Sequence, residues 1–296
     1  MNSYFERNAR ERLRGLLDDG RVDEFLPPTR RVTSPHLPQL DSPVAFDDGV
    51  IVGRGHLAGR PVLAAAQEGS FNGGAVGEVH GAKLVGLLQR ARRERPAAVL
   101  LLLDTGGVRL HEANAGLIAV SEVMRAILEA RNDGIPVIVL IGGANGCFGG
   151  MGIAACCASS VIMSEEGRLG LSGPEVIETA HGVEEYDARD RALVWRTCGG
   201  KHRYLLGDCQ RLVPDSIDAF RAAALEAIAD GAAPISLEGL RREHAMLKRR
   251  MELAEACRDP QELWTRLGVA NAAALPMLEA DAFIAATDDA RRQAWA

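Results

Sequence analysis

Two glycine-rich turns carry the clearest chemistry in this sequence. The first, DTGGVR, contains Gly106 and Gly107, and the second closes with Gly149 and Gly150. Glycine pairs let a turn present bare backbone N–H groups to a ligand, and two such donors can hold a carbonyl oxygen as it becomes an enolate oxygen. The sequence therefore predicts an oxyanion site at each turn, and tight structural turns are the equal alternative from glycine count alone.

The side chains near these turns include few other reactive groups. Arg109 could face a carboxylate or phosphate, although a salt-bridged arginine is the more common outcome. His80 and His111 both follow glycine turns, and a structural hydrogen bond is the more common role for either histidine. No GxSxG nucleophile elbow occurs, and the adjacent Cys156 and Cys157 fall in a small apolar helix, where thiols are usually inert.

Motifs and composition exclude several other classes of protein. Neither turn matches the GxxxxGK(S/T) or GxGxxG patterns, which argues against nucleoside triphosphates and dinucleotides. The six cysteines lack CxxC spacing, so we expect reduced thiols and no metal site. The formal net charge of -6 offers no basic face for nucleic acid. No segment resembles a signal peptide or a membrane span, so we expect a cytoplasmic protein without a membrane partner.

Buried strands are predicted to position both turns. Residues 97–103 and 135–141 are apolar without alternation, which is typical of strands covered on both faces, and each run leads into one glycine turn. Other predicted elements alternate around them: strands over 50–52, 61–66 and 160–163, and helices over 76–93, 113–130 and 150–158. Such alternation predicts an α/β architecture with ligands at the carboxyl ends of the strands.

The segments on either side of this core have different patterns. Residues 4–19 predict a surface helix, and five prolines make residues 27–43 an irregular arm. Long amphipathic helices are predicted over 216–230, 235–257 and 260–268. We therefore divide the chain into an N-terminal helix and proline-rich arm (1–49), a core (50–215) and a C-terminal helical extension (216–296).

Five motifs follow one another along the predicted core. They are GRPV (59–62), GGAVGEVHGAK (73–83), DTGGVR (104–109), GCFGGM (146–151) and GPEVIE (173–178). In this order they resemble the carboxyltransferase β subunits of acyl-CoA carboxylases, which are members of the crotonase-like superfamily. Four stretches resemble more closely the β subunits of biotin-independent malonate decarboxylases. These are GVRLHEANAGL (107–117), GCFGGM (146–151), LGLSGPEVIE (169–178) and GVEEYDARDR (182–191).

The resemblance implies a fold, a reaction and a set of partners. The fold would be a crotonase-like ββα spiral with an N-terminal arm and a C-terminal helical extension. The reaction would be decarboxylation of a malonyl thioester to the acetyl thioester, with the substrate carried on the CoA-derived prosthetic group of an acyl carrier protein. The chain itself would bind no biotin and no metal. Its partners would be a homologous γ carboxyltransferase subunit, the acyl carrier protein and an acyl-carrier transferase subunit.

The resemblance also implies which residues meet the substrate. The N–H groups of Gly149 and Gly150 would hold the thioester carbonyl, and Gly106 and Gly107 would hold the pocket floor or the departing carboxyl group. The group that protonates the acetyl carbanion stays open between Tyr186, His80, a partner residue and water. The implied substrate-binding residues are Gly73, Gly74, His80, Arg109, Phe148, Gly173 and Pro174.

Other functions stay open at this point. A biotin-dependent carboxyltransferase belongs to the same superfamily, although this chain lacks a cysteine-rich zinc ribbon and has Val108 where those proteins usually have alanine. A structural subunit whose glycine turns only shape a pocket is the second alternative. A crotonase-type hydratase would need acidic residues beside the substrate, and Glu112 is the only obvious neighbour of the turns.

Overall fold

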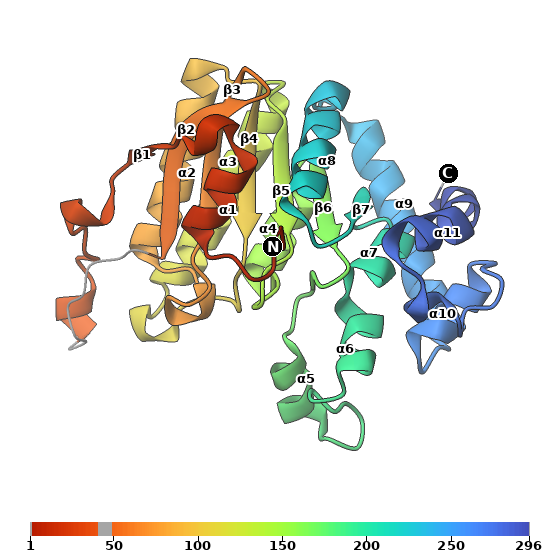
Figure 1. Ribbon diagram of the computed structural model, residues 1–296. Coiled ribbons are helices and arrows are strands. Elements are labelled where there is room, and N and C mark those ends of the chain that lie inside the picture. The colour runs from red at the N-terminus through yellow and green to blue at the C-terminus, as the bar shows by residue number, and fades with distance from the viewer. Residues whose placement is uncertain (1, 41–48, 296) are drawn as a thin grey trace.

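The central sheet has a spatial order that follows the chain (Figure 1). The computed structural model describes residues 2–40 and 49–295, and within them seven strands form one sheet in the order β1 to β7. β1, β2 and β3 are antiparallel neighbours, and β3 to β7 run parallel. The strands are β1 Asp23–Phe25, β2 Val50–Leu57, β3 Arg60–Gln67, β4 Ala98–Leu103, β5 Val137–Ile141, β6 Ser160–Ser164 and β7 Arg211–Val213.

Helices cover both faces of this sheet and extend beyond it. They are α1 Ala9–Leu16, α2 Glu78–Glu94, α3 Ala115–Asn132, α4 Gly150–Cys156, α5 Pro174–His181, α6 Arg191–Cys198, α7 Gly200–Leu206, α8 Ile217–Asp230, α9 Leu237–Ala254, α10 Pro260–Arg266 and α11 Ala280–Trp295. α5 and α6 project from the body beyond the carboxyl ends of β4 to β6, and α9 to α11 gather on one side (Figure 1). The predicted alternation of strands and helices in the core is therefore confirmed.

The two central strands are buried on both faces, as their uninterrupted apolar sequence predicts. Every residue of β4 and β5 is buried. Because successive strand residues point to opposite faces, Leu101 and Val139 pack with α2 and α3, whereas Leu100 and Leu140 pack with α1 and α8. Two apolar layers thus fix the strand ends from which the glycine turns begin.

Helix α1 belongs to the second of these layers, which differs from the surface helix expected there. Leu13 and Leu16 are buried against Ile217 and Phe220 of α8. Asn8 caps α1 through a capping box with Glu11, which explains why the helix begins later than predicted. The proline-rich segment, which the sequence predicts to be irregular, contains two short 3-10 helices through residue 40, Pro28–Arg30 and Leu37–Leu40, with irregular backbone between them. Its remaining predicted part (41–43) lies outside the described residues. The three-part division of the chain stays a prediction.

Short extended pieces beyond the strand ends form a second, smaller ladder. Thr105 pairs in parallel with Cys147, and Cys147 pairs in parallel with Leu169. Val76 pairs in parallel with Val108 on the other side. β4 and β5 are each followed by such a piece and then by a helix, which is the ββα repeat expected from the sequence. In the described part of the chain, no helix is long and apolar enough to cross a membrane.

Candidate active site

The two glycine turns lie against one another. The Thr105 N–H donates to the Gly146 carbonyl at 2.7 Å, and the Phe148 N–H donates to the Thr105 carbonyl at 2.9 Å. A Cβ atom at Gly149 would lie 3.1 Å from the Gly107 Cα, so the two backbones approach as closely as glycine allows. The predicted sites at the ends of β4 and β5 are therefore one site.

Two further segments extend this site on either side. The Gly106 N–H donates to the Gly73 carbonyl at 2.9 Å, and the Gly149 N–H donates to the Leu171 carbonyl at 2.8 Å. Glycine-rich backbone thus forms a continuous strip that we call the glycine strip, made of residues 73–74, 106–107, 149–150 and 169–171. The strip runs along the carboxyl ends of the parallel strands, where α/β proteins bind their ligands.

These hydrogen bonds differ from the expectation that all four glycine N–H groups face a ligand. The N–H groups of Gly149 and Gly106 already donate to the strip itself, and the Gly107 N–H donates to the Thr105 hydroxyl at 3.2 Å. The Gly150 N–H is the first amide of α4, and no hydrogen bond of the described residues uses it. Of the four expected donors, Gly150 alone is open toward a ligand in this conformation of the described chain.

Backbone conformation or packing favours glycine at three positions of the strip, 74, 149 and 150. Gly149 has φ +66°, which other residues rarely adopt. A Cβ at Gly74 would lie 1.8 Å from the Asp104 carbonyl oxygen, and a Cβ at Gly150 would lie 2.7 Å from Val120 Cγ1. The first contact is with rigid backbone and the second is with a side chain, so position 150 tolerates change better than position 74.

Arg109 is buried and forms an ion pair, which is the more common outcome that the sequence analysis named for this arginine. Its guanidinium contacts Glu112 at 3.0 Å, and both side chains are almost fully buried. Its Nε also donates to the Ala75 carbonyl at 2.9 Å, while the second Glu112 oxygen accepts the Glu78 N–H at 2.7 Å. The ion pair joins the first turn to the start of α2, and the contact of Arg109 with substrate stays a prediction. Glu112 is committed to the same pair, which leaves the hydratase alternative without its acid.

His80 is also placed in the interior. Its ring is fully buried, and its Nε2 lies 3.1 Å from the Gln67 side-chain nitrogen. The Gln67 oxygen in turn accepts the Asp104 N–H at 3.0 Å. In this conformation the histidine supports the end of β4 through Gln67, and its contact with substrate stays a prediction.

Phe148 and Tyr186 meet on the other side of the strip. Both side chains are buried in a small cluster with Val194 and Cys198 under the projection formed by α5 and α6. The Tyr186 hydroxyl bonds to the Thr197 hydroxyl at 2.8 Å, and burial raises the Tyr186 pKa. The Phe148 ring packs against residues of the projection, and its role as a direct substrate contact stays a prediction.

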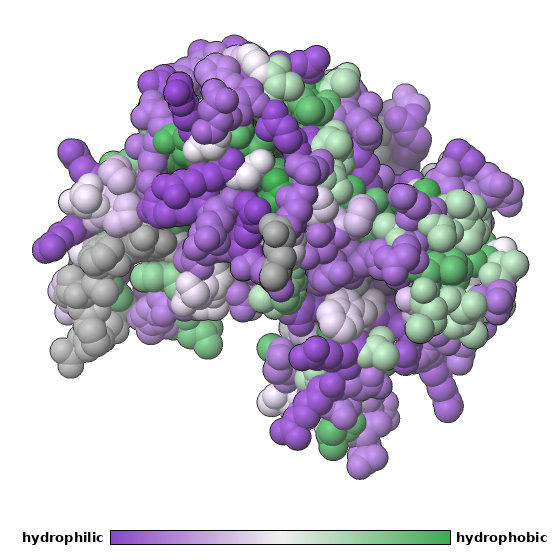
Figure 2. Space-filling view, viewed as in Figure 1, coloured by the Kyte–Doolittle hydropathy of each residue, from purple (hydrophilic) through white to green (hydrophobic). Residues whose placement is uncertain are grey.

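Gly173 and Pro174 begin the projection. Gly173 is the N-terminal cap of α5, and the buried Pro174 occupies the first turn of that helix, where a missing N–H costs nothing. Figure 2 shows a notch between this projection and the body of the protein. The two residues therefore set the direction of the projection beside the strip.

The thiols do not provide a nucleophile at this site. Burial raises the pKa of Cys147 within the second turn and raises that of Cys156 to about 11. Cys156 is an exposed residue of α4, although the surrounding protein still desolvates its sulfur. Thiols of this kind stay protonated near neutral pH. Among the described residues, no group of three or more histidines, cysteines or carboxylates could hold a metal ion.

Large apolar side chains are exposed around the strip. Leu171 belongs to the strip, and Ile153 lies on the helix that begins at Gly150. The others follow the first turn, in the loop before α3 and in its first turn. The exposed fractions are 87% for Leu110, 58% for Leu117, 62% for Ile118, 48% for Ile153 and 66% for Leu171. Exposed apolar side chains gathered at one site are typical of an interaction surface.

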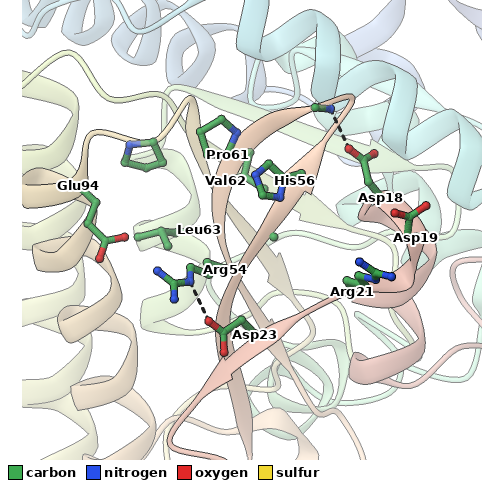
Figure 3. A pocket seen from close by; sticks show the side chains of 13 residues that line it. Asp18, Asp19, Arg21, Asp23, Arg54, His56, Pro61, Val62, Leu63 and Glu94 are labelled. Carbon is green, nitrogen blue, oxygen red and sulfur yellow. Dashed lines mark hydrogen bonds and ion pairs between the residues drawn. The ribbon is translucent and has the colours of Figure 1, made fainter.

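The cavity drawn in Figure 3 is a different place. It measures about 630 Å³ and lies at the start of β3, whereas the glycine strip lies at the carboxyl ends of the strands. Asp18 accepts the N–H groups of Gly59 at 2.8 Å and Ala58 at 3.0 Å and pairs with Arg221, and these bonds lower its pKa to about 2. The Asp18 carboxylate is committed to holding the β2–β3 turn, so this cavity has no part in the candidate site.

Comparison with known proteins decides the family. The model of the carboxyl transferase domain family matches residues 6–198. The chain belongs to the carboxyl transferase family. A malonyl-S-ACP:biotin-protein carboxyltransferase from Malonomonas rubra is 42% identical to it over 96% of this chain and 95% of that protein. The match to the family begins at residue 6, just before α1, so it includes this helix that packs in the core.

Solved structures are similar to this carboxyl transferase over most of its length. A Pseudomonas malonate decarboxylase hetero-tetramer in complex with malonate contains a chain that is 42% identical, with a TM-score of 0.80 over 89% of this chain and 96% of the other. A Pseudomonas malonate decarboxylase hetero-dimer contains one that is 39% identical, with a TM-score of 0.67 over 84% and 96%. The crotonase-like α/β fold expected from the sequence is confirmed.

Proposed function

We propose that this carboxyl transferase is the decarboxylating subunit of a malonate decarboxylase. Its substrate would be a malonyl thioester on the prosthetic arm of an acyl carrier protein, and its product the acetyl thioester. The observation that carries the proposal is the likeness to a malonate decarboxylase chain at 42% identity over 89% of this sequence. The relative that acts on a malonyl thioester of a carrier protein supports the same substrate.

The chemistry of this reaction suits a strip of backbone amides. The bond between the carboxylate carbon and the α-carbon breaks, carbon dioxide leaves, and the electron pair moves onto the thioester carbonyl to give an enolate. A proton then adds to the α-carbon. The barrier depends on how well the developing enolate oxygen is held, and one preorganised donor contributes about 3 kcal/mol.

We assign the enolate oxygen to the open Gly150 N–H. Gly149 supplies the left-handed turn that aims this amide, because its own N–H is bonded to Leu171. Gly106 and Gly107 form the floor beside it, and the Gly107 N–H is the candidate second donor, since its bond to the Thr105 hydroxyl is long at 3.2 Å. Gly73 and Gly74 close the far end of the floor. The proton donor stays open between Tyr186, a partner residue and water.

A second function shares the same enolate. The Malonomonas relative is named for transfer of the carboxyl group to a biotin protein, so the carboxyl acceptor could be biotin in place of loss as free carbon dioxide. The two functions differ in the product that accompanies the acetyl thioester. Decarboxylation gives free carbon dioxide and takes up one proton from the solvent or a protein group, whereas transfer gives carboxylated biotin, and the N–H of biotin supplies the proton. The structural features of the strip described above serve both.

Partner subunits follow from the exposed side of the site. The two Pseudomonas structures are a hetero-dimer and a hetero-tetramer. We propose that a homologous γ subunit covers the apolar side chains around the strip and completes the water-poor pocket. The acyl carrier protein and the acyl-carrier transferase subunit are proposed as further members of the complex.

The deciding experiment is an assay of the assembled complex. The chain is co-expressed with its candidate γ subunit, stripped of biotinylated protein on avidin, and supplied with malonyl carrier protein labelled in the free carboxyl group. We expect stoichiometric labelled carbon dioxide and acetyl carrier protein. A requirement for added biotin protein would support the second function, and full turnover by the γ subunit without this chain would reduce the chain to a structural role.

A further inference from the structure

A buried ion pair beneath the second glycine turn connects that turn to the first helix. Arg12 of α1 and Asp104 at the end of β4 meet at 2.7 Å between Nη1 and Oδ2, and their side chains are 3% and 5% exposed. Arg12 also donates from Nε to the Tyr4 carbonyl at 3.0 Å and from Nη2 to the Phe5 carbonyl at 3.2 Å. Three bonds from one planar group hold the guanidinium in a single orientation.

The other oxygen of Asp104 holds the second turn. Its Oδ1 accepts the Asn145 N–H at 2.7 Å. The backbone of the turn surrounds the carboxylate so closely that a Cβ at Gly143 would lie 2.2 Å from the Asp104 Cγ. One carboxylate thus joins a cation from α1 to the loop that leads into Gly149 and Gly150.

The segment before α1 supports the same turn from below. A Cβ at Gly142 would lie 2.9 Å from Cδ1 of Tyr4, so the tyrosine ring is in contact with the first residue of the turn. That ring packs on Phe220 with centroids 4.2 Å apart, and the Arg12 guanidinium lies 4.8 Å from its centre. Arg12 therefore orders both the floor of the turn and the carboxylate that ties it.

We propose that Arg12 is a positioning residue for the reaction, acting through Asp104 to fix the direction of the Gly150 N–H. This inference rests on the proposed function. Arg12 is buried and bonded to Asp104, Tyr4 and Phe5, so it acts on the turn and not on the substrate. A donor that loses its exact direction loses most of its effect, because catalytic groups must be held within about 0.5 Å of the productive geometry.

The test compares two arginines of the same helix in the assembled complex. Arg12→Gln removes the cation from Asp104, and Arg10→Gln is the matched control, since Arg10 pairs with Glu24 near the surface. We expect Arg12→Gln to lower kcat about tenfold or more with KM within about twofold, because the turn binds but no longer aims its donor. Arg10→Gln should keep both values. Arg12→Lys should recover part of kcat, since an ammonium can pair with Asp104 but cannot also hold two carbonyls.

A second measurement does not depend on activity. Hydrogen exchange of the peptide covering residues 141–150 should accelerate in Arg12→Gln and stay unchanged in Arg10→Gln. If Arg12→Gln does not fold, the Arg12→Gln/Asp104→Asn variant replaces the pair by two neutral groups of similar shape and should show the same acceleration and lower kcat. Normal kcat or unchanged exchange in a folded Arg12 variant would overturn the inference. A wild-type complex without decarboxylation would instead count against the proposed function, and the exchange comparison would still decide the role of Arg12 in the turn.

Discussion

The amides of the glycine strip show what single residues can and cannot reveal. The glycine pairs and their position after buried strands were readable in the sequence. The sequence did not show which of these amides are free of hydrogen bonds within the protein. The Gly149 and Gly106 N–H groups donate to the carbonyls of Leu171 and Gly73, and only the folded ladder brings those carbonyls near. His80 and Arg109 likewise lie near the turns in sequence but point into the interior, where Gln67 and Glu112 bind them.

Replacement of Gly150 tests the assigned donor directly. Gly150→Pro removes the one open N–H at the first position of α4, where helices tolerate proline. We expect kcat to fall by about 10² to 10³, as for loss of one oxyanion donor in other enzymes. The measurement is steady-state decarboxylation by the complex.

The control for this change is Gly150→Ala, which keeps the N–H. Both substitutions add a Cβ that meets Val120 at 2.7 Å, so each is made together with Val120→Ala to open space. The alanine variant should retain activity within about threefold of Val120→Ala alone. Equal loss in the two variants would show that packing at position 150, and not its amide, limits the reaction.

At the scale of elements, strong and continuous patterns were predictable and short or distant ones were not. β4, β5, α2 and α3 match their predicted ranges to within a few residues. β1 and β7 have three residues each, and they are strands only because they pair with the neighbouring strands β2 and β6. The burial of α1 depends on α8, about 200 positions away, and no local pattern contains that contact.

Helix α9 has an environment unlike that of α3, although both have 18 residues. α3 has seven buried residues and α9 has none, and Leu240 and Met251 of α9 are exposed by 57% and 67%. Helices of this length depend on packing for most of their stability. We therefore expect backbone amides of α9 to exchange at least about tenfold faster than those of α3 in the purified chain, as measured by hydrogen exchange and mass spectrometry. Equal protection of the two helices would contradict this account.

For the whole molecule, the arrangement leaves the glycine strip on an open side. The carboxyl ends of β4 to β6 face the notch beside the α5–α6 projection (Figures 1 and 2), and the exposed apolar side chains lie around the same edge. An enolate is stabilised best where water is excluded, so a subunit that covers this edge would raise the effect of each amide.

Polar substitution at this edge tests the covering subunit. Leu117→Ser together with Ile118→Ser should weaken co-purification of the proposed γ subunit about tenfold or more, because the contact would depend on apolar side chains. Leu128→Ser, at the far end of the same helix and 39% exposed, is the control and should leave co-purification unchanged. Retention of the γ subunit at the wild-type level by the double variant would place the contact elsewhere.

The contacts of the first residues have a consequence for biosynthesis. The N–H groups of Tyr4 and Phe5 donate to Asp215, and the Tyr4 ring packs on Phe220. A nascent polypeptide emerges from the ribosome with residue 4 about 200 positions ahead of Asp215 and Phe220, so the segment before α1 has no docking place until those residues have been made. Because the Tyr4 ring also contacts Gly142, we expect the loop that carries Gly150 to become fully ordered only after α8 has been made.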